Sequence, residues 1–238
     1  MVNLELVNVT KVIHKNTVID GVTFSLQSGN IYGFQGINGS GKTMLMRLIS
    51  GLIRPTQGRI TVNNKILGKD ITFPGSIGML LENPSFLDGY SGFNNLKMLA
   101  SIQKKIDADE VRRAIKSVGL NPDEKKKYRK YSLGMKQRLG IACAIMEKPD
   151  IVILDEPTNS LDTDGVNLVK SIVMQEKKRG ALVIISCHDL SILQNLSDEI
   201  VLLKDGKMTE HIIMKDIQKR SQHEKKVDSN HTDCLLAN

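Results

Sequence analysis

The residues best suited to chemistry lie in one glycine-rich stretch, residues 36–43, with the sequence GINGSGKT. The stretch fits the P-loop pattern GxxxxGK[ST], with a strand predicted before it and a helix after it. Glycines let backbone N–H groups turn toward one phosphate, and the helix presents its positive end to the same group. Lys42 is expected to reach the terminal phosphates, and the Thr43 hydroxyl to ligate Mg²⁺. The predicted phosphate-binding residues are Gly36, Ile37, Asn38, Gly39, Ser40, Gly41, Lys42 and Thr43.

A pair of carboxylates is the second candidate, because Asp155 and Glu156 directly follow the apolar stretch 151–154. In a parallel sheet, ligands bind at the carboxyl ends of the strands. Asp155 could hold Mg²⁺ there, directly or through water. Glu156 could act as the base that polarises a water for attack on a γ-phosphate. Together the two motifs predict a nucleoside triphosphatase that uses Mg²⁺.

Hydrophobic periodicity predicts the strands that must position these residues. Alternating and apolar runs predict strands within residues 1–35, a hairpin over 59–67 and a strand over 77–81. After residue 150, apolar strands alternate with helices, which implies a parallel sheet covered on both faces. A second hairpin is expected to close the sheet over residues 200–212.

The region from about 84 to 148 is predicted to be helical. Leu96, Leu99 and Ile102 are expected to share one helix face. A second helix is expected over residues 109–118, and a third is expected to start at Ser132, a good N-cap residue.

Composition places the chain among ordinary globular proteins. It has 238 residues, 40% hydrophobic and 25% charged, enough for one core. No stretch approaches the roughly 20 apolar residues of a membrane-spanning helix, and the N-terminus does not resemble a signal peptide, so we expect a cytosolic location. The three cysteines are far apart, which argues against a disulfide framework or a zinc site. Cys143 and Cys187 are expected to be small core residues.

The net charge of +7 raises the question of whether the protein binds nucleic acid. The excess is spread out, with clusters within residues 125–130 and 215–226 and without an RNA-binding aromatic motif. We therefore interpret it as a solvated basic surface near lipid head groups and expect no specific nucleic-acid partner.

Four further motifs identify a family. Residues 131–138, YSLGMKQR, resemble the signature motif of ATP-binding cassettes, usually written LSGGQ. Residues 159–162, NSLD, resemble the D-loop of that family, and residues 186–189, SCHD, resemble the loop that carries its switch histidine. Residues 20–24, DGVTF, are similar to the segment that leads to its P-loop. The resemblance covers residues 1 to about 217, and residues 218–238 are expected to be a polar tail.

The resemblance implies an α/β P-loop NTPase core, similar to RecA, with an N-terminal antiparallel β-subdomain and an inserted α-helical subdomain at about 84–148. It implies that Ser132 and Gly134 meet the γ-phosphate held by a second copy of the chain, so that two chains enclose two ATP molecules. It also implies that His188 contacts the γ-phosphate. The partner would be a separate transmembrane permease, and the chain would lie on the cytoplasmic face of the membrane.

Three departures from the family pattern stand out. Leu133 and Met135 replace the usual glycine and glutamine of the signature motif. Ile13 falls where the family stacks an aromatic ring on adenine, so base selectivity or affinity is expected to be weaker. Glu82 replaces a glutamine and is expected near Mg²⁺ and near the permease. A glutamate there resembles cassettes of bacteriocin or lantibiotic immunity exporters, which export peptides.

Two other functions remain as alternatives at this stage. A cassette that acts on ribosomes or DNA would suit the basic charge, but such proteins usually carry two cassettes or a long coiled-coil insertion. A small-molecule kinase would use the same P-loop but would leave the signature motif and His188 unexplained.

Overall fold

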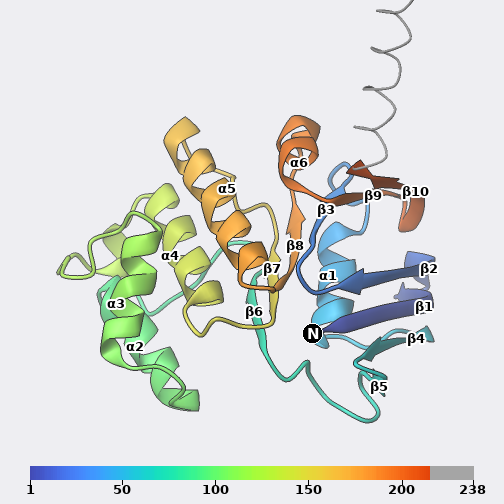
Figure 1. Cartoon of the computed structure of the whole chain (residues 1–238), viewed down its shortest axis with the longest axis horizontal. Helices are drawn as coiled ribbons and strands as arrows, with labels where there is room; N and C mark the ends of the chain where they lie inside the picture. The colour runs from blue at the N-terminus through green and yellow to red at the C-terminus, as the bar shows by residue number, and fades with distance from the viewer. Residues whose placement is uncertain (215–238) are drawn as a thin grey trace, which may run out of the picture.

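A mostly parallel sheet forms the centre of the computed structural model, which describes residues 1–214 (Figure 1). Its strand order is β10-β9-β3-β8-β7-β6, and only the pairing of β9 with β10 is antiparallel. The strands are β3 (Ile31–Gln35), β6 (Ile77–Leu80), β7 (Ile151–Leu154), β8 (Leu182–Ser186), β9 (Glu199–Lys204) and β10 (Lys207–Ile213). Every residue of β7 and β8 is buried, as expected for parallel strands that are covered on both faces.

A smaller antiparallel sheet has the order β2-β1-β4-β5. Its strands are β1 (Asn3–Ile13), β2 (Asn16–Gln27), β4 (Gln57–Val62) and β5 (Lys65–Ile66). Helix α1 (Lys42–Ser50) lies between this sheet and the larger one (Figure 1). Leu45, Leu48 and Ile49 of the helix share a core with the small sheet and with Ile151 and Ile153 of β7. The helix that begins at the P-loop is therefore fixed by apolar contacts on two sides.

The opposite face of the larger sheet packs in a second core. Val152 and Leu154 of β7 belong to it, because neighbouring residues of a strand point to opposite faces. Helices α4 (Leu133–Ile145), α5 (Thr163–Lys178) and α6 (Leu190–Leu196) contribute to this core, and so do buried residues of the two helices at 92–103 and 108–117. Strand β7 thus carries Asp155 at its end, between the two cores.

Helices fill most of the region between β6 and β7. They are α2 (Gly92–Gln103), α3 (Ala108–Ser117), the short 3-10 helix η1 (Tyr128–Lys130) and α4. Each α-helix has a side-chain N-cap: Ser91, Asp107 with a full capping box, and Ser132. The starts of these helices are therefore set locally by the sequence.

The predicted apolar face of α2 is wrong. Leu96 is buried, but Leu99 is partly exposed and Ile102 is 75% exposed. Positions three and six residues beyond Leu96 turn about 60° and 120° away from it on an α-helix. Ala100, four residues on, lies close to the same line and is buried instead.

The α/β fold class predicted from the sequence is confirmed, including the antiparallel sheet and the helical insertion. Within residues 1–214, no helix is long and apolar enough to cross a membrane. Cys187 is buried and Cys143 is partly buried. The polar tail predicted for residues 218–238, together with Cys234, lies outside the described residues.

Candidate functional site

The P-loop connects β3 to α1 and depends on glycine at several positions. A Cβ at Gly36 would collide with the carbonyl oxygen of Leu203 and with the hydroxyl of Ser40. Gly41 adopts a φ of 107°, which residues with a side chain rarely adopt. No side chain caps the first turn of α1, so its backbone N–H groups remain available to an anion.

Lys42 is folded into this loop and is only 6% exposed. Its ammonium donates hydrogen bonds to the carbonyl oxygens of Gly36 at 2.7 Å and Ile37 at 3.3 Å. It also lies 3.6 Å from Oε1 of Glu156. The cation is therefore held at the centre of the loop, where an incoming phosphate would be bound.

Thr43 and Asp155 meet beside Lys42. The Thr43 hydroxyl donates a 2.5 Å hydrogen bond to Oδ2 of Asp155, and Oδ1 accepts a 2.6 Å hydrogen bond from the hydroxyl of Ser186. A hydroxyl and a carboxylate are the hard oxygen ligands that Mg²⁺ prefers. Among residues 1–214 no group of three or more histidine, cysteine or acidic side chains could hold a metal ion by itself. The pair suits an ion that takes its remaining ligands from phosphate and water.

Glu156 follows Asp155 with a φ of 49°, a conformation that costs energy in a non-glycine residue. Its backbone N–H donates to Ser186 Oγ at 2.8 Å, and its carbonyl accepts from the Gln137 side chain at 3.1 Å. Nε2 of His188 lies 3.2 Å from its Oε1. Both carboxylate oxygens are buried, and within residues 1–214 neither accepts a hydrogen bond of good geometry. A carboxylate held this way is suited to binding and polarising a water.

These groups open into a cavity of about 530 Å³, which we call the P-loop cavity. Its lining residues are Thr17, Val18, Asn38, Gly39, Ser40, Gly41, Lys42, Thr43, Met44, Arg47, Glu82, Asp155, Glu156, Asp205 and Gly206. Ile13, the expected adenine contact, is not in this lining. Thr17 and Val18 at the start of β2 are in the lining. The structure therefore brings most of the predicted phosphate and metal ligands together, while Gly36 and Ile37 are outside the lining.

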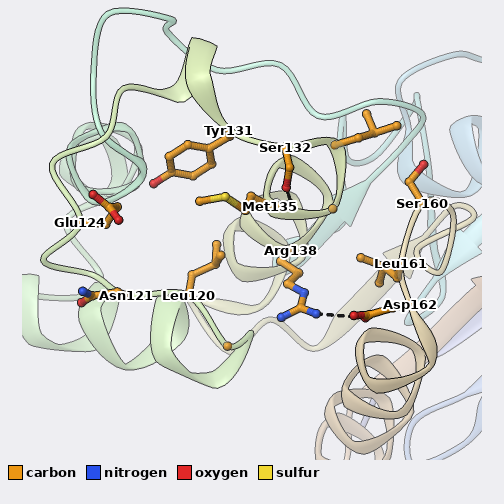
Figure 2. A pocket seen from close by; sticks show the side chains of 13 residues that line it. Leu120, Asn121, Glu124, Tyr131, Ser132, Met135, Arg138, Ser160, Leu161 and Asp162 are labelled. Atoms are coloured by element: carbon orange, nitrogen blue, oxygen red, sulfur yellow. Dashed lines mark hydrogen bonds and ion pairs between the residues drawn. The ribbon is translucent and has the colours of Figure 1, made fainter.

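Ser132 and Gly134 line a different cavity of about 680 Å³, the signature cavity (Figure 2). Ser132 Oγ accepts a 3.2 Å hydrogen bond from the N–H of Met135, so it caps α4. Ser160, Leu161 and Asp162 of the D-loop form the opposite wall (Figure 2). The two cavities share no lining residue. Within one chain, the signature motif and the P-loop thus form separate sites.

Glu82 lines the P-loop cavity, but its carboxylate is paired. Oε1 of Glu82 lies 2.5 Å from Nη2 of Arg47, which belongs to α1. Arg47 is a site residue that the sequence patterns did not single out. It lies four residues after Thr43, a spacing that places both side chains on one helix face, and this spacing is the signal that could have indicated it. Ser186 was included only as the first residue of the SCHD motif, with no role of its own assigned to it.

A P-loop, a buried strand ending in two carboxylates and a separate capped signature helix together define an ATPase of the cassette class. A family model described as "ABC transporter" matches residues 19–159, more than half of the chain. The chain belongs to this family of ABC transporter ATP-binding proteins and is an ATP-hydrolysing subunit. The predictions of family, function and ATPase activity are confirmed.

Similar proteins support this assignment. The uncharacterized ABC transporter ATP-binding protein YybJ of Bacillus subtilis is 47% identical over 89% of this chain and 98% of its own length. The bacitracin transport ATP-binding protein BcrA of Enterococcus faecalis is 34% identical over 92% of this chain and 72% of its own. The lantibiotic transport ATP-binding protein SrtF of Streptococcus pyogenes is 32% identical over 86% of this chain and 88% of its own length.

A solved structure shows the same fold. It is the dimeric post-hydrolysis state of the ATP-binding cassette MJ0796 bound to ADP and Pi, with a TM-score of 0.78 and 21% identity. The match covers 89% of this chain and 98% of that one.

Proposed function

We propose that two copies of this chain bind two ATP molecules between them, each held by the P-loop of one copy and the signature motif of the other. The observation that carries this proposal is the separation of the two cavities within one chain. Ser132 and Gly134 lie at the start of α4, where they line the signature cavity and not the P-loop cavity. A helix N-terminus suits an anion, and a second copy can supply that anion as a γ-phosphate. The dimeric state of the similar cassette MJ0796 supports the same arrangement.

Different residues of the chain then have different roles in ATP hydrolysis. The P-loop N–H groups and Lys42 bind the phosphates and offset their charge. Thr43 and Asp155 would hold Mg²⁺, which stabilises charge on the phosphates when bound. Glu156 binds the attacking water and accepts its proton. His188, at 3.2 Å from Glu156, orients that carboxylate and reaches toward the γ-phosphate.

A membrane permease is the proposed partner, and a groove of about 630 Å³ is its proposed docking site. The groove lies between the loop after Glu82 and helix α2, and Leu87, Met98 and Leu99 expose apolar surface along it. Exposed apolar residues around a groove suit a partner segment with an apolar face. Because Glu82 adjoins both this groove and the P-loop cavity, the loop can transmit the nucleotide state to the permease.

The proposed cargo is a peptide antibiotic, moved outward by a transporter whose ATPase lies on the cytoplasmic face of the membrane. The support is the similarity to ATP-binding proteins named for bacitracin and lantibiotic transport, together with the glutamate at position 82.

The decisive variant is Glu156→Gln, which keeps the shape of the side chain and removes the base. ATP hydrolysis is expected to fall by about 10²–10⁴-fold. The variant should then elute as a dimer in Mg-ATP and as a monomer without nucleotide. Glu210→Gln, the same change at an exposed position on β10, is the matched control and should behave as wild type. Normal turnover by Glu156→Gln would reject its role as base. Loss of turnover without dimer formation in Mg-ATP would reject the shared-site arrangement.

A further inference from the structure

An arginine on the P-loop helix holds the carboxylate of Glu82. Arg47 lies one turn after Thr43 on α1, so both side chains lie on the same face of the helix. Its Nη2 is 2.5 Å from Oε1 of Glu82. Both residues line the P-loop cavity together with Asp155 and Glu156. The ion pair is therefore part of the nucleotide site.

The charges around this cavity explain why such a pair would matter. Four acidic side chains line it: Glu82, Asp155, Glu156 and Asp205. The only cations in the lining are Lys42 and Arg47, and Lys42 is already 3.6 Å from Glu156. A nucleoside triphosphate brings several further negative charges. An unpaired carboxylate at position 82 would repel it and would also compete with phosphate for a divalent cation.

The backbone conformation of Glu82 helps to place it at the edge of the P-loop cavity. Its φ of 57° turns the chain sharply at the end of β6, directly before the loop that forms the proposed permease groove. Glu82 is 59% exposed and Arg47 is 35% exposed, so the pair contributes little to the stability of the fold. The ion pair instead affects the electrostatic potential inside the P-loop cavity and the direction in which the Glu82 carboxylate points.

We propose that Arg47 is a positioning residue for the nucleotide site. It holds Glu82 on the guanidinium, away from the Thr43–Asp155 pair, and offsets the negative charge of that carboxylate. Arg47 thereby allows this chain to carry the Glu82 carboxylate next to a triphosphate without loss of affinity. This inference rests on the ATP binding described above.

The test is equilibrium binding of a fluorescent, non-hydrolysable ATP analogue, with Mg²⁺ and with a chelator. Arg47→Gln should weaken binding by about three- to tenfold at low salt, because one unit charge in the cavity loses its partner. The loss should shrink in about 0.5 M salt, since both groups are partly exposed. The double variant Arg47→Gln/Glu82→Gln should bind as tightly as wild type or more tightly.

The matched control is Arg112→Gln. Arg112 pairs with Asp123 at similar exposure, 37% and 69%, on the helical region and outside the P-loop cavity. It should leave nucleotide affinity unchanged. Binding of the analogue to wild type in the same assay tests the ATP site itself. A wild-type protein that does not bind the analogue would contradict the proposed ATP site, whereas the comparison of wild type with Arg47→Gln tests the role of Arg47. Should Arg47→Gln be too unstable to measure, Arg47→Lys keeps the charge and should retain most of the affinity.

Two results would overturn the inference. If the double variant binds as weakly as Arg47→Gln, then Arg47 acts on the nucleotide directly and not through Glu82. If Arg47→Gln binds like Arg112→Gln at low salt, the ion pair does not influence the site.

Discussion

Ser186 supports Asp155 and Glu156, the two carboxylates proposed to hold Mg²⁺ and to act as base, and its removal should lower the stability of the fold. Its side-chain hydroxyl donates to Asp155 Oδ1 at 2.6 Å and accepts from the N–H of Glu156 at 2.8 Å, and the residue is fully buried. Ser186→Ala leaves a buried carboxylate oxygen and a backbone N–H without partners. A lost hydrogen bond to a charged group costs about 1.5–3 kcal/mol and a neutral one about 1 kcal/mol. The free energy of unfolding should therefore fall by about 2–4 kcal/mol.

For a chain of this size, that loss lowers the melting temperature by about 5–15 °C. Differential scanning calorimetry measures it, and a phosphate-release assay should show reduced ATP turnover because Asp155 and Glu156 lose their support. The matched control is Ser197→Ala. Ser197 is also buried, but its hydroxyl has no hydrogen-bond partner among the described residues, so its loss should be neutral or stabilising. Equal destabilisation by the two variants would refute the argument, since the hydrogen bonds would then contribute nothing.

Three further predictions follow from the site and the surface. Lys42→Ala should lose the rise in melting temperature that Mg-ATP gives wild type, a stabilisation of about 2.7 kcal/mol at 100 times Kd; an equal rise in both proteins would contradict the role of Lys42. Binding to DNA or RNA should be weak and should fall steeply with salt, so sequence-selective binding near physiological salt would favour a nucleic-acid function instead. Burial, with a smaller contribution from Glu147, raises the pKa of the Cys143 thiol to about 11. In a Cys234→Ser background, maleimide should therefore label native Cys143 slowly at pH 8, where about one molecule in a thousand is thiolate, and fast labelling would contradict the burial.

The fold could be predicted largely from the sequence because its strands are short apolar runs with clear ends. The P-loop, the Asp155–Glu156 pair and the Ser132 cap each combine a local pattern with a strand or helix end, which fixes their place in three dimensions. The apolar face of α2 was missed because Leu, Ile and Ala can all satisfy a helical pattern. Ala100 lies on the face of α2 that packs into the core, whereas Ile102 lies on the exposed side of the helix.

The remaining site features depend on contacts between residues far apart in the chain. Arg47 and Glu82 are 35 residues apart, and no local pattern indicates that they pair. Ser186 supports Asp155 across 31 residues, through the pairing of β7 with β8. Such contacts follow from tertiary packing and cannot be read from spacing alone.

The burial of β7 on both faces has a consequence for how the strand finds its register. Since its four residues are all apolar and both neighbouring layers are apolar, a slip of one residue would exchange the faces at little hydrophobic cost. Asp150 and Asp155, which bracket the strand, remove this ambiguity. A slip in either direction would draw a carboxylate into an apolar layer, at a cost of several kcal/mol. The carboxylate at the catalytic end of β7 therefore also specifies the alignment of the central sheet during folding.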